Sequence, residues 1–104
     1  MPFLIFAEDH EGKEIERESV RAAHRAHLAL AGKKLLASGA IFGSDGKTIV
    51  GGASLLDTED EDEARRFEQE DPYAQAGIRA RVTIVPWRLR WWCGKFSAEG
   101  FQSY

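Results

Sequence analysis

The chain has 104 residues, of which 43% are hydrophobic and 30% charged, and its formal net charge is −3 at pH 7. This length predicts a single domain covering residues 1–104, and the excess of acidic side chains argues against a nucleic-acid partner. No apolar run approaches the roughly 18 residues of a membrane-spanning helix, and the first residues lack the pattern of a signal peptide. Cys93 is the only cysteine, so no intrachain disulfide can form, and a cytoplasmic location without a membrane partner is expected.

The first third of the chain predicts a strand followed by one long helix. Residues 3–7, Phe-Leu-Ile-Phe-Ala, form a short run of strand formers that is typical of a buried strand. From Ile15 to Ala31 the spacing of three and four residues predicts an amphipathic helix, and Gly32 is expected to end it. The face that this helix turns towards the core is predicted to carry Val20, His24, His27, Leu28 and Ala31.

The middle of the chain predicts a β-hairpin. Leu35 to Phe42 and Thr48 to Leu56 both have strand composition, and the segment Ser44–Lys47 between them contains an Asp-Gly pair. The adjacent glycines Gly51 and Gly52 indicate a bulge or a close approach of two backbones.

The third quarter of the chain predicts a second helix. Thr58 and Glu61 have the spacing of a capping box, so a helix is expected from about Glu59 to Glu70. Ala64 and Phe67 would be its anchors in the core. The helix should end at Asp71, because a proline follows it.

The last strand is predicted over Ile78 to Trp87. Its alternation assigns Ile78, Ala80, Val82 and Ile84 to one face, and Arg79, Arg81 and Thr83 to the other. The resulting β-α-β-β-α-β order predicts an α+β, ferredoxin-like fold with both helices on one face of the sheet. The uncovered face is expected to contact a second subunit, which predicts a homodimer or a larger homo-oligomer.

Two histidines are the first candidates for chemistry. His24 has an imidazole whose ordinary pKa suits general acid–base catalysis, provided that a partner orients the ring. The alternative is a half-buried histidine with both ring nitrogens satisfied. A metal site would use His24 and His27 with a third ligand such as Asp9, His10 or Asp71. No Cys cluster or H-E-x-x-H motif supports that possibility, so no metal is expected.

Two arginines precede His24 on the same side of the predicted helix. Arg17 and Arg21 beside an imidazole would attract a carboxylate or a phenolate. They could equally pair with Glu14 and Glu18 on the helix surface. The serines lack a nucleophile-elbow context, and the glycines match neither a phosphate loop nor a dinucleotide-binding motif, so no cofactor is expected.

Residues 88–104 extend beyond the core of residues 1–87. The segment Trp87–Cys93 alternates tryptophan with arginine, a composition that can stack on single-stranded nucleic acid. Arginine stacking on tryptophan within the protein, or a tail seated on a partner subunit, explains it as well. The acidic net charge favours the seated tail.

Several of these segments together resemble the YciI-like, or YCII-related, family. The similarity spans about Met1 to Trp87 and is carried by Val20-Arg21-x-x-His24, Leu35-Leu36-Ala37-Ser38-Gly39, Asp71-Pro72-Tyr73-x-x-Ala76-Gly77 and Val82-x-Ile84-x-Pro86-Trp87. The resemblance implies a dimeric α/β-barrel assembly of ferredoxin-like subunits and an acid–base pair that falls on His24 and Asp71. The chain departs from the family pattern in having Ala40 where proline is frequent, and His27 is an additional histidine near the expected substrate site.

The leading hypothesis is a small cofactor-free enzyme, an isomerase or a dehydrochlorinase-like lyase, acting on a small anionic or phenolic substrate. His24 would carry the proton and Asp71 would orient the ring. Arg17 and Arg21 would hold the charge of the substrate, and Tyr73 would donate to its oxygen. The alternatives are a non-catalytic module that binds a small ligand and an assembly protein that acts through its tryptophan-rich tail.

Overall fold

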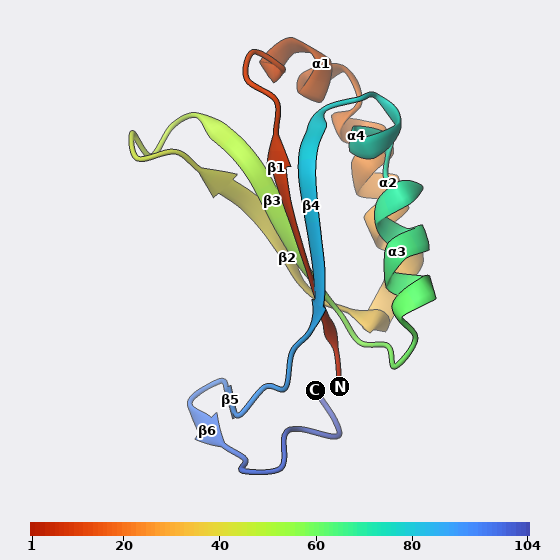
Figure 1. The fold of residues 1–104 in the computed structure, drawn as a ribbon, viewed down its shortest axis with the longest axis vertical. Coiled ribbons are helices and arrows are strands. Elements are labelled where there is room, and N and C mark those ends of the chain that lie inside the picture. The colour runs from red at the N-terminus through yellow and green to blue at the C-terminus, as the bar shows by residue number, and fades with distance from the viewer.

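The computed structural model describes residues 1–104 and contains a four-stranded antiparallel sheet (Figure 1). Its elements in chain order are β1 (Phe3–Asp9), α1 (Glu14–Ser19), α2 (Arg21–Ala31), the 3-10 turn η1 (Gly32–Lys34), β2 (Leu35–Phe42), β3 (Ile49–Leu56), α3 (Glu61–Gln69), α4 (Pro72–Gln75), β4 (Arg79–Pro86), β5 (Trp91–Trp92) and β6 (Lys95–Phe96). The strand order in the sheet is β2-β3-β1-β4. This order confirms the predicted ferredoxin-like α+β fold.

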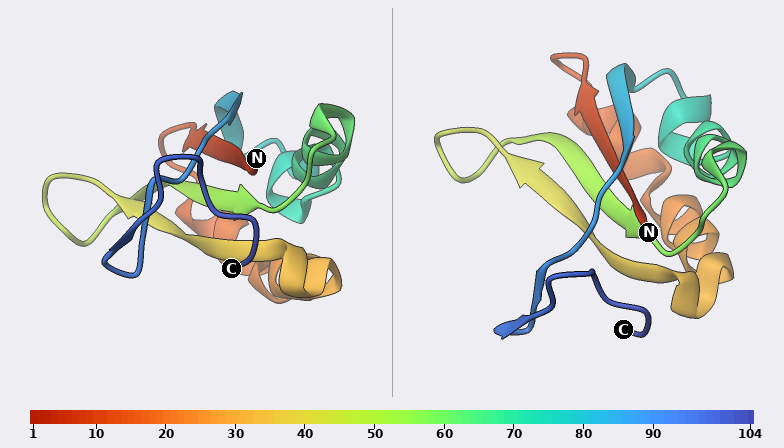
Figure 2. Two further views of the ribbon diagram at one scale, coloured as in Figure 1. Left: turned by 90° about the horizontal axis from the view of Figure 1, so that it is seen from below. Right: turned by 60° about the horizontal axis from the view of Figure 1, so that its bottom comes forward.

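The helices lie on one face of the sheet and leave the other face open (Figures 1 and 2). Helix α3 contacts β1 and β4, and α2 contacts α4. The core between the layers consists of Phe3, Ile5, Leu56 and Ala64, with Phe67 packed against it. The predicted inward positions of Ala64 and Phe67 are thus confirmed. None of the helices has the length and apolarity needed to cross a membrane.

The single helix predicted from Ile15 to Ala31 is wrong, because the structure divides it into α1 and α2. Val20 leaves the helical conformation, with φ −111° and ψ 8°. The hydroxyl of Ser19 donates to the backbone carbonyl of Glu16, a local bond that competes with helix continuation. The break turns α1 away from the axis of α2 and lets Arg17 reach Asp9 on β1.

The N-terminus of α3 also differs from the prediction. The N-cap is Asp60, whose carboxylate accepts from the backbone N–H of Asp62. The Thr58 hydroxyl accepts instead from the N–H of Asp60, one turn before the helix. Both residue types cap well, and the aspartate lies nearer the first helical turn.

The approach of β3 to β1 explains the pair of adjacent glycines. A Cβ at Gly51 would lie 2.1 Å from the carbonyl oxygen of Ala7, so only glycine fits there. This confirms the predicted close contact of two backbones. It also fixes the register in which Ala7 lies opposite Gly52.

The predicted facing of Arg79 away from the core is wrong. A register shift between Glu8 and Asp9 on β1 places Asp9 opposite Arg79 at the start of β4. Such a bulge turns a side chain to the other face of a sheet. Arg79 consequently lies under the helices, where its side chain is only 8% exposed.

The tail forms a small hairpin that the sequence pattern does not predict. Strands β5 and β6 pair Trp91 with Phe96, and the turn between them uses Cys93 and Gly94 with positive φ angles of 51° and 80°. Leu89 is buried and fixes the start of the tail. Figure 2 shows this hairpin on the side of the sheet away from the helices.

Candidate active site

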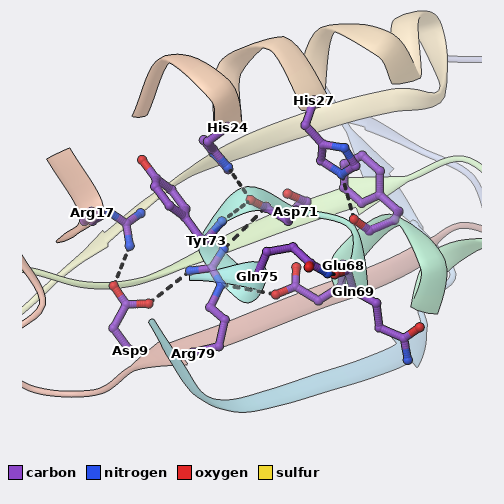
Figure 3. Close-up of polar contacts among 12 residues, drawn as sticks. Asp9, Arg17, His24, His27, Glu68, Gln69, Asp71, Tyr73, Gln75 and Arg79 are labelled. Atoms are coloured by element: carbon purple, nitrogen blue, oxygen red, sulfur yellow. Dashed lines mark hydrogen bonds and ion pairs between the residues drawn. The ribbon is translucent and has the colours of Figure 1, made fainter. Parts of the chain in front are cut away.

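The structure brings His24 and Asp71 into contact across two helices. Nδ1 of His24, on α2, lies 2.8 Å from Oδ1 of Asp71, which precedes α4 (Figure 3). The two side chains are 17% and 3% exposed, so the pair lies at the edge of the interior rather than in open solvent. These are the two residues that the sequence analysis selects as a catalytic pair, and their role in catalysis stays a prediction.

The position of Asp71 is fixed by the local sequence. Asp71 is the N-cap of α4, and its Oδ1 accepts the backbone N–H of Tyr73 at 2.9 Å. Proline at the first helical position favours this geometry, because its φ angle suits a helix start and it lacks an N–H. The carboxylate that caps α4 is therefore also the one that faces His24.

The Asp71 carboxyl is held in its ionised form. Burial by itself would raise its pKa, but the hydrogen bonds from His24 and from the Tyr73 backbone, with the nearby charge of Arg79, outweigh burial and lower the pKa below its ordinary value. An ionised carboxylate can only accept hydrogen bonds, so Nδ1 of His24 must carry the hydrogen. In the neutral imidazole this leaves a lone pair on Nε2.

That second nitrogen is open to a ligand. Every buried side-chain nitrogen or oxygen in the structure has a hydrogen-bond partner. Nε2 of His24 has none, so it is not sealed in the interior. A histidine with Nδ1 bound to a carboxylate and Nε2 free has the arrangement that a general base requires.

Behind the pair lies a buried ionic network centred on Arg79. Its guanidinium contacts Asp9 at 3.0 Å and Glu68 at 3.1 Å, and it lies 3.7 Å from the second oxygen of Asp71. Arg17 also bonds to Asp9 (Figure 3). Glu68 and Arg79 carry no sequence signal for this site, since a bulge in β4 and a helix–strand contact bring them there.

The network carries an uneven charge. It contains three carboxylates and two guanidinium groups, so one negative charge is left when His24 is neutral. Burial raises the pKa of Glu68 above its ordinary value, although Arg79 opposes the shift. A proton on His24 would make the sum of these charges zero.

Tyr73 forms the wall between the pair and the arginines. Its ring stacks on His24 with centroids 3.9 Å apart and planes 17° apart. The guanidinium carbons of Arg17 and Arg79 lie 4.3 Å and 5.2 Å from the centre of the same ring. The ring is buried, but its hydroxyl has no hydrogen-bond partner within the chain. No buried polar atom lacks a partner, so this hydroxyl reaches the surface and is free to donate.

Two hollows lie on this side of the sheet, and His24 lines one of them. The inner one, about 340 Å³, lies between α2 and the β2–β3 half of the sheet and is lined by His24 and Tyr73. The outer one, about 820 Å³, lies between the loop after β1 and the β2–β3 hairpin. Arg17 and Arg21 line both, so the two hollows are neighbours that share a wall. Their volumes are in the range of small-molecule sites.

Of the remaining predicted site residues, Arg21 lies at this site and His27 lies against α3 instead. Arg21 lies at the site and pairs with Glu18 at 2.8 Å, in a half-exposed contact that an anion could compete with. His27 does not line the hollows beside His24, because its Nε2 donates to the carbonyl of Phe67 at 2.7 Å. No three His, Cys, Asp and Glu side chains gather in a way that could hold a metal ion.

Comparison with known proteins identifies a family that the chain matches. The YCII-related domain matches residues 1–88. The 5-chloro-2-hydroxyhydroquinone dehydrochlorinase TftG from Burkholderia phenoliruptrix AC1100, solved with 2,5-dihydroxybenzoquinone, is 30% identical with a TM-score of 0.77, over 85% of this chain and 94% of that one. SnoaB, a cofactor-independent oxygenase from Streptomyces nogalater, is 16% identical with a TM-score of 0.51, over 85% and 92% of the two chains, and shares the fold.

No curated protein matches the sequence. The tail beyond residue 88 lies outside the family match. The match nevertheless covers most of the chain and includes every residue of the site described above. The chain therefore belongs to the YCII-related family.

Proposed function

We propose that this protein is a small enzyme in which His24 and Asp71 move a proton on a phenolic or anionic ring substrate. The observation that carries the proposal is the Nδ1–Oδ1 contact of 2.8 Å with Nε2 left without a partner beside a hollow. In this mechanism Nε2 removes the proton of a ring hydroxyl, and Asp71 stabilises the imidazolium that forms.

The reaction then follows from where the electron pair of the phenolate goes. If the ring carries a halogen, the imidazolium first returns the proton to the carbon that bears the halogen, which gives a keto tautomer. His24 then removes the proton of a second ring hydroxyl, the electron pair moves through the ring and expels the halide as a quinone forms, and this second proton passes to solvent. If no leaving group is present, the imidazolium returns the proton to a ring carbon, which is an isomerisation. The similarity to a dehydrochlorinase favours elimination and 5-chloro-2-hydroxyhydroquinone as the first compound to assay.

Three further side chains would hold the substrate. Arg21 would exchange its half-exposed contact with Glu18 for the negative charge of the substrate. Arg17 is bound to Asp9, so it would act mainly by offsetting the charge of that carboxylate and by fixing the ring of Tyr73. The free hydroxyl of Tyr73 would donate to a ring oxygen.

We also propose that the open face of the sheet joins two copies of the chain. A hollow of about 510 Å³ lies on that face, and ten of its 13 lining residues are hydrophobic. Trp87 and Val85 beside it are 46% and 40% exposed. Exposed apolar surface of this kind is typical of an interface, and Trp91 of the tail lines the same hollow.

The proposal is tested by turnover of 5-chloro-2-hydroxyhydroquinone, followed as chloride release, in the wild type and in His24→Ala. We expect a loss of about 10² to 10⁴ in kcat. The matched control is His27→Ala, which removes a histidine from the same helix outside the hollow and should keep turnover. Unchanged turnover in His24→Ala would rule out the mechanism. Tight binding of ring compounds without turnover of any would favour a non-catalytic module.

A separate experiment addresses the hypothesis of an assembly protein. Deletion of residues 89–104 removes the hairpin β5–β6 and leaves the family domain whole. If the deletion abolishes self-association while turnover is absent in both forms, assembly through the tail becomes the better description.

A further inference from the structure

The floor of the inner hollow is flat because small residues lie opposite one another in adjacent strands. The strand register aligns Ala40, Gly52 and Ala7 in one row across β2, β3 and β1. None of these side chains extends beyond Cβ, so this row leaves room beneath α2. A Cβ at Gly52 would lie 3.3 Å from the carbonyl oxygen of Gly39, which is tighter than an ordinary van der Waals contact. A planar ring is the shape that such a floor accepts.

The next row of the same sheet face is polar where it reaches the hollow. Ser38 on β2 lies opposite Ser54 on β3, and their hydroxyl oxygens are 2.9 Å apart. Both residues line the inner hollow together with His24. Ile5, the next residue in this row, belongs to the core, so the two hydroxyls stand at the border between core and hollow.

The serine pair has hydrogen-bonding capacity to spare. Two hydroxyls offer two hydrogens and four lone pairs, and their mutual bond uses one of each. One hydrogen and three lone pairs remain, so the pair can both donate to a carbonyl oxygen and accept from a hydroxyl. No other hydrogen bond of either side chain is present in the structure.

A cation without a partner completes the wall of the hollow. Arg25 on α2 lines it, is exposed, and forms no ion pair or hydrogen bond within the chain. Arg21, one turn earlier, is held only by Glu18. The hollow thus presents a base on one side, two hydroxyls on its floor and positive charge along α2.

We propose that Ser38 and Ser54 recognise a second oxygen substituent of the ring whose first oxygen faces His24. The ligand class is accordingly a planar six-membered ring with two hydroxyl or carbonyl oxygens and a negative charge, which Arg25 attracts. The identity of the first oxygen rests on the proposed function, whereas recognition by the serines and Arg25 concerns binding alone.

The test measures calorimetric affinities of three probes, 2,5-dihydroxybenzoate, 2-hydroxybenzoate and 3-hydroxybenzoate, for the wild type and for the double variant Ser38→Ala/Ser54→Ala. We expect the double variant to bind the dihydroxy probe roughly fivefold more weakly, and to lose much less affinity for whichever monohydroxy probe lacks the oxygen that the serines bind. The affinities of the three probes are compared with one another within each variant, so a general loss of folded protein affects all three equally.

Two controls complete the design. Ser97→Ala removes a serine hydroxyl that bonds Gly100 in the tail, outside the hollow, and should change no affinity. Arg25→Gln should weaken all three carboxylated probes alike. Equal losses for the three probes in the double serine variant, or no loss, would overturn the proposal.

The outcomes also separate this inference from the proposed function. If the serine variants discriminate among the probes while His24→Ala keeps turnover, the recognition site stands and the acid–base mechanism falls. If His24→Ala loses turnover while the serine variants bind all probes like the wild type, the mechanism stands and the recognition site falls.

Discussion

His24 and His27 lie one turn apart on α2, are both half-buried, and have opposite surroundings. His24 meets a carboxylate within a network of buried charges, and its second nitrogen is free. His27 donates to a backbone carbonyl and stacks on Phe67 with ring centroids 5.0 Å apart. The two histidines share residue type, helix and degree of burial, so what distinguishes them is the ring nitrogen that the fold leaves without a partner in His24.

The difference arises from the element that each histidine faces. His24 faces the start of α4, where the capping carboxylate of Asp71 has a lowered pKa and is held ionised. His27 faces α3 near its C-terminal end, where backbone carbonyls lack helical partners and accept from side chains. One histidine therefore keeps a ring nitrogen free, as the proposed proton transfer requires, and the other joins two helices.

The largest expected effect comes from removing the centre of the network around His24. Arg79→Met deletes the only ion pair of Glu68 and one partner each of Asp9 and Asp71. Leaving buried carboxylates without their counter-charge should lower the free energy of unfolding by about 3 to 5 kcal/mol, measured by urea denaturation.

Arg66→Met is the matched control for that measurement. Arg66 lies on α3, is exposed and forms no ion pair, so the same substitution should change stability by less than about 0.5 kcal/mol. A similar decrease in the free energy of unfolding in the two variants would show that the buried network stabilises the fold no more than an exposed arginine does.

The second prediction concerns acid and Asp71. The folded-state pKa of Asp71 is lowered, so its ionised form stabilises the protein above the unfolded pKa of about 3.9, and this contribution is lost as the pH falls through the folded value. At neutral pH, Asp71→Asn should cost about 1.5 to 3 kcal/mol, the range for hydrogen bonds to a charged group.

The difference in free energy of unfolding between wild type and Asp71→Asn should therefore become smaller below about pH 4, because the wild-type carboxyl then takes up a proton. Denaturation at a series of pH values checks this. Glu68 acts in the opposite sense, since burial raises its pKa and its ionisation disfavours folding as the pH rises. A difference that stays constant into acid would show that Asp71 is not stabilised as a carboxylate.

The third prediction is smaller and concerns the other histidine. His27→Ala removes the hydrogen bond to the Phe67 carbonyl and the ring contact, and should lower the free energy of unfolding by about 1 to 2 kcal/mol. Turnover should stay within about twofold of the wild type. A selective loss of turnover without a loss of stability would place His27 in the substrate site after all.

The sequence predicted the arrangement of strands and helices well, because period and turn chemistry are local. Leu35–Phe42 is found as predicted, and Ala64 lies in the core as the helical spacing indicates. The break at Val20 was not predicted, because apolar spacing continues across it and the contact of Arg17 with Asp9 is a tertiary one.

The candidate site was predicted only in its most local part. His24 and Asp71 came from motif resemblance, and helical periodicity alone could not distinguish His24 from His27. Arg79 was assigned to the wrong face, because a strict alternation along β4 cannot reveal that the strand has a bulge at Ala80. Glu68 offered no signal, since an acidic residue on a strongly acidic helix is typical of solvent-exposed surface.

The last prediction concerns the tautomers of His24 and His27 rather than the stability of the protein, and it tests the difference between the two histidines most directly. In ¹⁵N-detected NMR at a pH where both rings are neutral, His24 should carry its hydrogen on Nδ1 and His27 on Nε2, because Asp71 and the Phe67 carbonyl accept from those atoms. Asp71→Asn should release only His24 towards the other tautomer, leaving the signals of His27 unmoved. If both rings show the Nε2 hydrogen in the wild type, the carboxylate does not orient His24 and the free nitrogen faces away from the hollow. If the predicted tautomers are found, the base needs no rearrangement before it meets a substrate, since the lone pair on Nε2 is already exposed.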